Sequence, residues 1–148
     1  MSVLHVIQLG RMTVTFIMSE RQTRGYLDAF EVALPANGRI IVPHRHPDFD
    51  ETVIGLDGIT SWTVDGVIKQ IGPGEQLLIP RDAEHGFFNP SSKISRFMCI
   101  LTPGKLGPDY FQEIAIAMAG DAPIDYADIC AIMTRYGVIP VAMDQANL

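Results

Sequence analysis

Residues 38–58 read GRIIVPHRHPDFDETVIGLDG, and both the fold and the chemistry of the chain can be inferred outward from them. Two histidines, His44 and His46, lie two positions apart, and Glu51 follows after a polar turn. Side chains two positions apart on a β-strand point to the same face, so the two imidazoles are expected side by side. Glu51 opens the next strand, where its carboxylate could lie alongside both rings. Imidazole and carboxylate groups are common ligands of divalent metals, so these residues are candidate metal ligands.

This stretch belongs to a series of short β-like runs that extends from about Met12 to Pro103. Turn residues separate the runs every several positions, which is typical of an all-β domain. The expected strands are VTFIMS (14–19), LDAFEVAL (27–34), RIIVPH (39–44), ETVIGL (51–56), ITSWTV (59–64), VIKQI (67–71), EQLLIP (75–80), HGFFN (85–89) and ISRFMCIL (94–101). No helix-period stretch interrupts them, so we expect a closed barrel or a sandwich. In a closed barrel, His85 could lie beside the earlier histidines.

Turn chemistry supports this division. Asp57-Gly58 and Asp65-Gly66 predict type I′ hairpin turns, in which both central residues need a positive φ.

After Pro103 the pattern becomes helical, with a first helix capped at Asp109 and ending near Gly120, and a second helix that begins after the N-cap Asp125 and ends near Gly137. Arg135 is the only basic residue after Asp109, so we expect these helices to pack on the barrel or on a second subunit and not to bind DNA.

Composition narrows the class further. The chain has 148 residues, of which 47% are hydrophobic, and a formal net charge of -6. These values predict one domain over residues 1–148 and exclude nucleic acid as the main partner. No apolar run approaches the roughly 20 residues of a membrane-spanning helix, and the N-terminal stretch does not resemble a signal peptide. Cys99 and Cys130 lie in apolar contexts and are expected to be reduced thiols, which favours a cytoplasmic location over a disulfide between them.

Two motifs now identify a resemblance to the cupin family. The first cupin motif is matched at every defining position, by Gly38, His44, His46, Glu51 and Gly58. The second is matched, with one departure, by Gly74, Pro80, Asp82, His85 and Asn89. Cupins normally have glycine where this chain has Asp82. Aspartate tolerates a left-handed backbone in a turn, so the departure weakens neither the fold nor the ligand prediction much.

The resemblance implies an all-β fold, a double-stranded β-helix (jelly-roll) barrel over about residues 12–103 with a short C-terminal helical extension over about 107–140. It also implies one divalent transition metal, bound by His44, His46, Glu51 and His85. Three imidazoles and a carboxylate suit Fe, Mn, Ni, Cu or Zn, so the ligand types leave the metal open.

The flanking sequences resemble the small bacterial cupins of the quercetin-dioxygenase-like type. They include the acidic turn before Glu51, PRDAEH (80–85), TPG (102–104) and RYGV (135–138). This likeness predicts a metal-dependent dioxygenase acting on a small aromatic or enediol-like molecule, with Glu51 as the candidate general base. The alternatives are an isomerase or decarboxylase, a binding protein without turnover, and a metal that only stabilises the fold. An isomerase or decarboxylase of a polar acid or sugar predicts polar side chains beside the metal, with the candidates Arg45, Lys69, Arg81 and Arg96.

Further expectations concern the aromatic residues and association. Aromatic side chains on alternating strands are core residues first, so pocket lining is the second interpretation for Phe16, Phe30, Trp62, Phe87 and Phe97. His5 belongs to no pattern and is expected at the surface or at a subunit contact. Cupins commonly form dimers, and the apolar tail offers a contact surface, so the resemblance and the tail together predict a homodimer.

Overall fold

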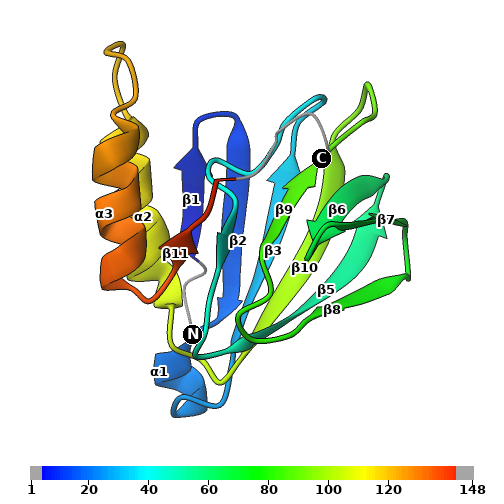
Figure 1. Ribbon diagram of the computed structural model, residues 1–148, viewed down its shortest axis with the longest axis horizontal. Helices are drawn as coiled ribbons and strands as arrows, with labels where there is room; N and C mark the ends of the chain where they lie inside the picture. Colours follow the sequence, from blue (N-terminus) through cyan, green and yellow to red (C-terminus); the bar gives the residue numbers. More distant parts are fainter. Residues whose placement is uncertain (1–4, 143–148) are drawn as a thin grey trace.

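The computed structural model describes residues 5–142 and is built mainly from two antiparallel β-sheets with helices at one side (Figure 1). Its strands are β1 (His5–Leu9), β2 (Met12–Met18), β3 (Asp28–Leu34), β4 (His44–Arg45), β5 (Asp50–Asp57), β6 (Thr60–Val64), β7 (Val67–Ile71), β8 (Gln76–Ile79), β9 (His85–Phe88), β10 (Ser95–Thr102) and β11 (Ile139–Pro140). Its helices are α1 (Glu20–Thr23), α2 (Gly107–Met118) and α3 (Tyr126–Arg135). Within residues 5–142, no helix combines the length and the apolar character needed to span a membrane.

The chain passes back and forth between the two sheets. The six-stranded sheet has the order β1-β2-β3-β10-β5-β8, and the five-stranded sheet has the order β11-β4-β9-β6-β7. After β3 the chain crosses to β4, returns for β5, and later comes back to pair β10 with both β3 and β5. This order agrees with a jelly roll. Closure of the sheets into one barrel stays a prediction.

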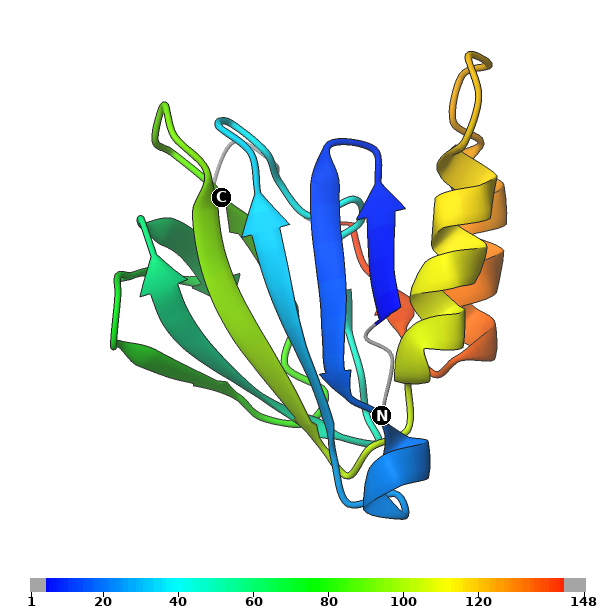
Figure 2. The same cartoon turned by 180° about the vertical axis from the view of Figure 1, so that it is seen from behind.

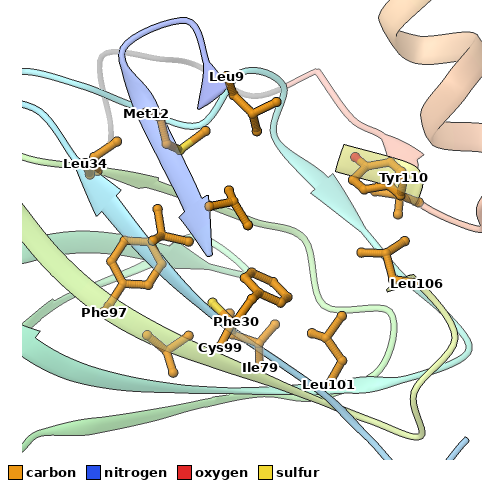
Figure 3. Close-up of a cluster of buried hydrophobic side chains, with 14 of the residues drawn as sticks. Leu9, Met12, Phe30, Leu34, Ile79, Phe97, Cys99, Leu101, Leu106 and Tyr110 are labelled. Atoms are coloured by element: carbon orange, nitrogen blue, oxygen red, sulfur yellow. The ribbon is translucent and has the colours of Figure 1, made fainter. Parts of the chain in front are cut away.

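Alternation of side chains explains which face of each strand is buried. In β2, Met12, Val14 and Phe16 are buried while the residues between them are partly exposed, and β10 follows the same period of two. These inward residues build one core between the sheets, and Figure 3 shows part of it. Every strand predicted from the sequence is present within two residues of its expected bounds, except the run over 39–44.

The run over residues 39–44 is the one wrong strand prediction. Only an isolated bridge at Arg39 and the two-residue strand β4 form there. Pro43 has no N–H to donate to a ladder, and the chain bends just before it. The Asp65-Gly66 turn is confirmed, with φ of 47° and 80°, but at Asp57-Gly58 only the glycine has a positive φ, because Asp57 remains in β5. Asp82 has the expected left-handed backbone, with φ of 67°.

The helical tail forms a separate layer. Helices α2 and α3 lie side by side next to β1, at the edge of the six-stranded sheet (Figure 2). Asp125 is the N-cap of α3, as predicted, and its side chain accepts a hydrogen bond from the backbone of Ala127. The prediction of an Asp109 cap is wrong, since α2 begins at Gly107. The carboxylate of Asp28, on β3, accepts from the first backbone N–H groups instead. The sequence patterns also missed β1, α1 and β11.

Candidate functional site

Three of the four histidines meet inside the fold. His44 lies on β4 directly opposite His85, the first residue of β9, and His46 follows β4. Their ring centroids are 4.7 Å (His44 to His85), 4.8 Å (His46 to His85) and 5.8 Å (His44 to His46) apart. One ring nitrogen of each lies within 4.8 Å of the others. Because β4 ends at Arg45, His44 and His46 do not share one strand, yet both rings reach the cluster. His5 is exposed on β1, outside this cluster.

Hydrogen bonds to backbone carbonyl groups fix the orientation of each of the three rings. Each Nδ1 lies 2.9–3.0 Å from a carbonyl oxygen, those of Val42, Phe49 and Ala83 for His44, His46 and His85 respectively. A carbonyl oxygen only accepts hydrogen bonds, so each Nδ1 carries the proton. A neutral ring then has its free lone pair on Nε2. This is the arrangement in which histidines ligate a metal.

Glu51 joins the cluster from the six-stranded sheet. Along β5 the buried positions are Glu51, Val53 and Gly55, so the strand period points the carboxylate inward. Its Oε1 lies 3.2 Å from Nε2 of His46 and 3.9 Å from Nε2 of His85. The structure therefore brings together all four residues that the sequence singled out.

The acid–base state of the cluster follows from these contacts. Burial works against ionisation of Glu51, but the hydrogen bond from His46 and the charges of the three histidines outweigh it and lower the pKa of Glu51 to about 2. Burial, together with the two neighbouring imidazoles, lowers the pKa of His44 to about 3. Burial also lowers the pKa of His46, but its hydrogen bond and attraction to Glu51 outweigh that effect, and the net shift is upward. The metal-free cluster thus holds an ionised carboxylate beside His46.

A buried cysteine contacts the second oxygen of Glu51. Cys99, on β10, is 3% exposed, and its thiol donates to Oε2 of Glu51 over 3.5 Å. Burial first, and then the negative charge of Glu51, raise the pKa of this thiol well above its usual value. Cys99 therefore remains a neutral donor that fixes one carboxylate oxygen and leaves the other facing the histidines. Both cysteines are free thiols, Cys130 being half-buried.

The cluster opens onto a cavity of about 90 Å³ between the sheets. Apart from the four candidate ligands, the side-chain polar groups that residues 5–142 contribute to its lining are the Cys99 thiol and the Tyr110 hydroxyl. None of its described lining residues is lysine or arginine. The three arginines considered as polar suppliers all pair with carboxylates outside the cavity, Arg45 with Asp82, Arg81 with Asp50 and Arg96 with Glu31, and Lys69 is exposed on β7.

Aromatic residues divide between the cavity and the core. Phe30, Phe87 and Phe97 line the cavity, whereas Phe16 and Trp62 are core residues that do not. Sequence reasoning missed further lining residues, namely Phe49 and a group from the helical tail that includes Tyr110, Phe111 and Met133. Figure 3 shows Tyr110 and Leu106 from the tail region near cavity residues of the strands. The buried residues of α2 and α3 follow the helix period, but the sequence does not show that this apolar face lies against the cavity beside the histidines.

One observation indicates that the three histidines and Glu51 suit a metal ion. Nε2 of His85 is buried without a hydrogen-bond partner, which is costly for a polar atom. That atom faces Glu51 and the other two rings. A divalent cation among these groups would satisfy it.

Comparison with known proteins shows which proteins this chain resembles. Residues 30–101, which include all four candidate ligands, match the cupin domain. A 51-residue segment (33% of this chain) is 47% identical to dimethylsulfoniopropionate lyase DddW of Ruegeria pomeroyi, and the chain covers 32% of that protein. Among solved structures, an RmlC-like cupin from Shewanella frigidimarina shares 18% identity and a TM-score of 0.60, over 72% of this chain and 88% of the other. The polyketide cyclase RemF from Streptomyces resistomycificus shares 23% identity and a TM-score of 0.58, over 69% and 79%.

These findings support the cupin superfamily for residues 30–101, and the two structures share the fold of this chain. They do not single out the quercetin-dioxygenase-like type. The chain spans about a third of the length of DddW. The named relatives include a lyase and a cyclase, so the fold and the cupin motifs are compatible with several chemistries.

Proposed function

We propose that this chain binds one divalent transition metal through His44, His46, Glu51 and His85, and that it oxidises a small aromatic or enediol-like substrate as a dioxygenase. The proposal is carried by three imidazoles whose Nε2 atoms face one another beside an ionised carboxylate in a mainly apolar cavity. Fe, Mn, Ni, Cu and Zn all suit these ligands, and metal analysis of the purified protein decides among them.

A metal held by His44, His46, Glu51 and His85 would supply Lewis acidity toward a substrate hydroxyl and, if redox-active, electron transfer to O₂. The chain's own residues have three tasks. The Nδ1 hydrogen bonds hold the rings in position. Glu51, ionised at neutral pH, accepts the proton of the incoming hydroxyl. The apolar walls exclude water and provide no charge that an uncharged substrate would have to displace.

One experiment tests this function. The protein is loaded with each metal in turn and mixed anaerobically with a panel of single-ring catechols and small enediols, with flavonols as probes larger than the cavity, and labelled oxygen is then admitted. We expect consumption of one O₂ per substrate and both labelled atoms in the products. If no metal and substrate pair consumes oxygen, the dioxygenase proposal is wrong.

A non-oxidative reaction is the second candidate, favoured by the 47% identity to a lyase over 51 residues. It predicts that product forms during the anaerobic stage, before oxygen enters. The absence of lysine and arginine from the described cavity lining argues against substrates with several charges under either candidate.

A homodimer, one domain over residues 1–148 and a cytoplasmic location stay predictions. Residues 1–4 and 143–148 of that domain lie outside the described residues.

The contact between Cys99 and Glu51 yields a prediction about metal affinity. Cys99→Val removes the donor to Oε2, so the carboxylate can turn away from the histidines, and we expect metal affinity to fall by about 10-fold, as for other groups that orient a ligand. Cys99→Ser keeps a donor and should restore most of that affinity. Calorimetric metal titration measures both. Cys130→Val, at the other free cysteine, is the control, and equal affinities for the two valine variants would contradict the prediction.

A further inference from the structure

The cavity beside the histidines has one wall that lies outside the cupin match. Residues 30–101 match the cupin domain, but α2 supplies Tyr110, Phe111 and Ile114 to the lining, α3 supplies Ile129 and Met133, and Val138 follows them. All but Phe111 are less than 8% exposed. The shape of the cavity is therefore set partly by a segment that the cupin motifs do not describe.

This wall is attached at both of its ends, to the six-stranded sheet at the first and to a candidate ligand strand at the second. At the start of α2, the carboxylate of Asp28 accepts hydrogen bonds from the backbone of Leu106 and Gly107. After α3, β11 pairs with β4, and Pro140 lies opposite His44 itself. Both ends of the helical tail are therefore held against the strands that surround the cavity.

The size of the cavity limits what it can hold. Its volume is about 90 Å³. An apolar cavity of about 150 Å³ in another protein accommodates one benzene molecule, so a single six-membered ring is the upper limit here and already needs small movements of the wall. Methionine side chains such as Met133 allow such adjustment because they are flexible. A fused two-ring or three-ring molecule is larger than this volume.

The charge of the lining limits the ligand further. Within the part of the chain that the structure describes, Glu51 is the one carboxylate that lines the cavity beside the imidazoles, and the lining there contains no lysine or arginine. An anionic group buried away from the histidines would have no partner and would be strongly disfavoured. Hydrocarbon and aromatic walls instead favour an uncharged ring.

We propose that α2 and α3 close this cavity to the size of a single ring and thereby select a small, uncharged, mainly apolar ligand. This inference rests on the proposed function only for the reaction of the bound ligand at the metal site. The selection of the ligand by size and charge depends on the cavity walls and does not require a bound metal. It makes Met133 and Val138 specificity-determining residues.

The test uses the metal-free full chain and three probes, phenol, benzoate and 2-naphthol, with binding measured by NMR chemical-shift titration at pH 7. We expect phenol to bind at least tenfold more tightly than either the charged or the two-ring probe. Met133→Ala lengthens the cavity and should bring 2-naphthol to within about threefold of phenol. Val138→Leu adds one methylene to the wall and should weaken phenol binding severalfold. Ile129→Val is the milder enlargement to use if Met133→Ala does not fold.

Ile116→Ala is the matched control, because Ile116 lies on α2 but is 76% exposed and does not line the cavity. It should leave all three affinities unchanged. The inference is overturned if no probe binds, if benzoate or 2-naphthol binds the wild-type chain as well as phenol does, or if the wall variants behave like Ile116→Ala. Failure of the dioxygenase proposal would show separately, as a lack of oxygen consumption by a metal-loaded chain that still discriminates among the probes.

Discussion

Replacement of His85 by alanine should lower metal affinity by about 100-fold or more. Groups that merely orient a ligand contribute 10- to 100-fold, and a ligand itself should contribute at least the upper value. His85 is 1% exposed, and its Nε2 has no hydrogen-bond partner among residues 5–142. Its loss leaves His44, His46 and Glu51 to hold the ion. Calorimetric titration of the metal-free variant and elemental analysis of the purified one measure the effect.

The same substitution should reduce the stabilisation that metal gives to the fold. At a metal concentration 100 times the Kd, bound metal adds about 2.7 kcal/mol to the free energy of unfolding, and a 100-fold weaker site adds only about 0.4 kcal/mol. For a domain of this size, the difference is a melting temperature lower by roughly 5–9 °C in the presence of metal. His5→Ala is the control, since His5 is exposed and outside the cluster. If His85→Ala and His5→Ala bind metal equally well, the proposed ligand set is wrong.

The ligand cluster could be predicted from the sequence because its information is local. His44, His46 and Glu51 fall within one short motif and His85 and Asn89 within a second, although the strand period does not explain the ring directions, because β4 ends at Arg45 and His46 lies beyond it. In the structure, the side-chain amide of Asn89 donates to the carbonyl groups of Leu34, Pro35 and Lys93, as expected for a residue that orders a turn. The direction of each Nε2 could not be predicted, since it depends on carbonyl groups placed by the folded backbone.

The walls of the cavity could not be predicted, because their contacts join distant parts of the chain. Period-two burial correctly turns Phe16, Phe30 and Phe97 inward, but it does not distinguish a cavity wall from a filled core. Phe30 borders the cavity and Phe16 does not, although the two rings lie 5.2 Å apart. The helix period likewise identifies Ile129 and Met133 as an apolar face without showing what it covers. The sequence also did not predict that Asp28 accepts from the first N–H groups of α2, because Asp28 lies far from α2 along the chain.

Asp28 is the long-range contact that attaches this wall to the six-stranded sheet. Its side chain is fully buried, at 0% exposure, near the start of β3. One carboxylate oxygen accepts from the backbone N–H of Glu20, at 2.8 Å, and the other from those of Leu106 and Gly107, at 3.0 and 3.3 Å. A single side chain therefore satisfies the first N–H groups of α1 and α2 together. It ties the beginning of the helical tail to the sheet.

Asp28→Ala should lower the free energy of unfolding by about 3–5 kcal/mol, since three backbone N–H groups lose their acceptor and each buried, unsatisfied group costs about 1–3 kcal/mol. Asp28→Asn keeps one oxygen, and the loss should be smaller. Urea denaturation measures both. Asp125→Ala, which removes an ordinary exposed cap from α3, should cost only about 1 kcal/mol. Because α2 forms a wall of the cavity, Asp28→Ala should also weaken phenol binding while leaving metal affinity near that of the wild type. A stability loss no larger than that of Asp125→Ala would show that the helical tail is held mainly by its apolar contacts and not by this carboxylate.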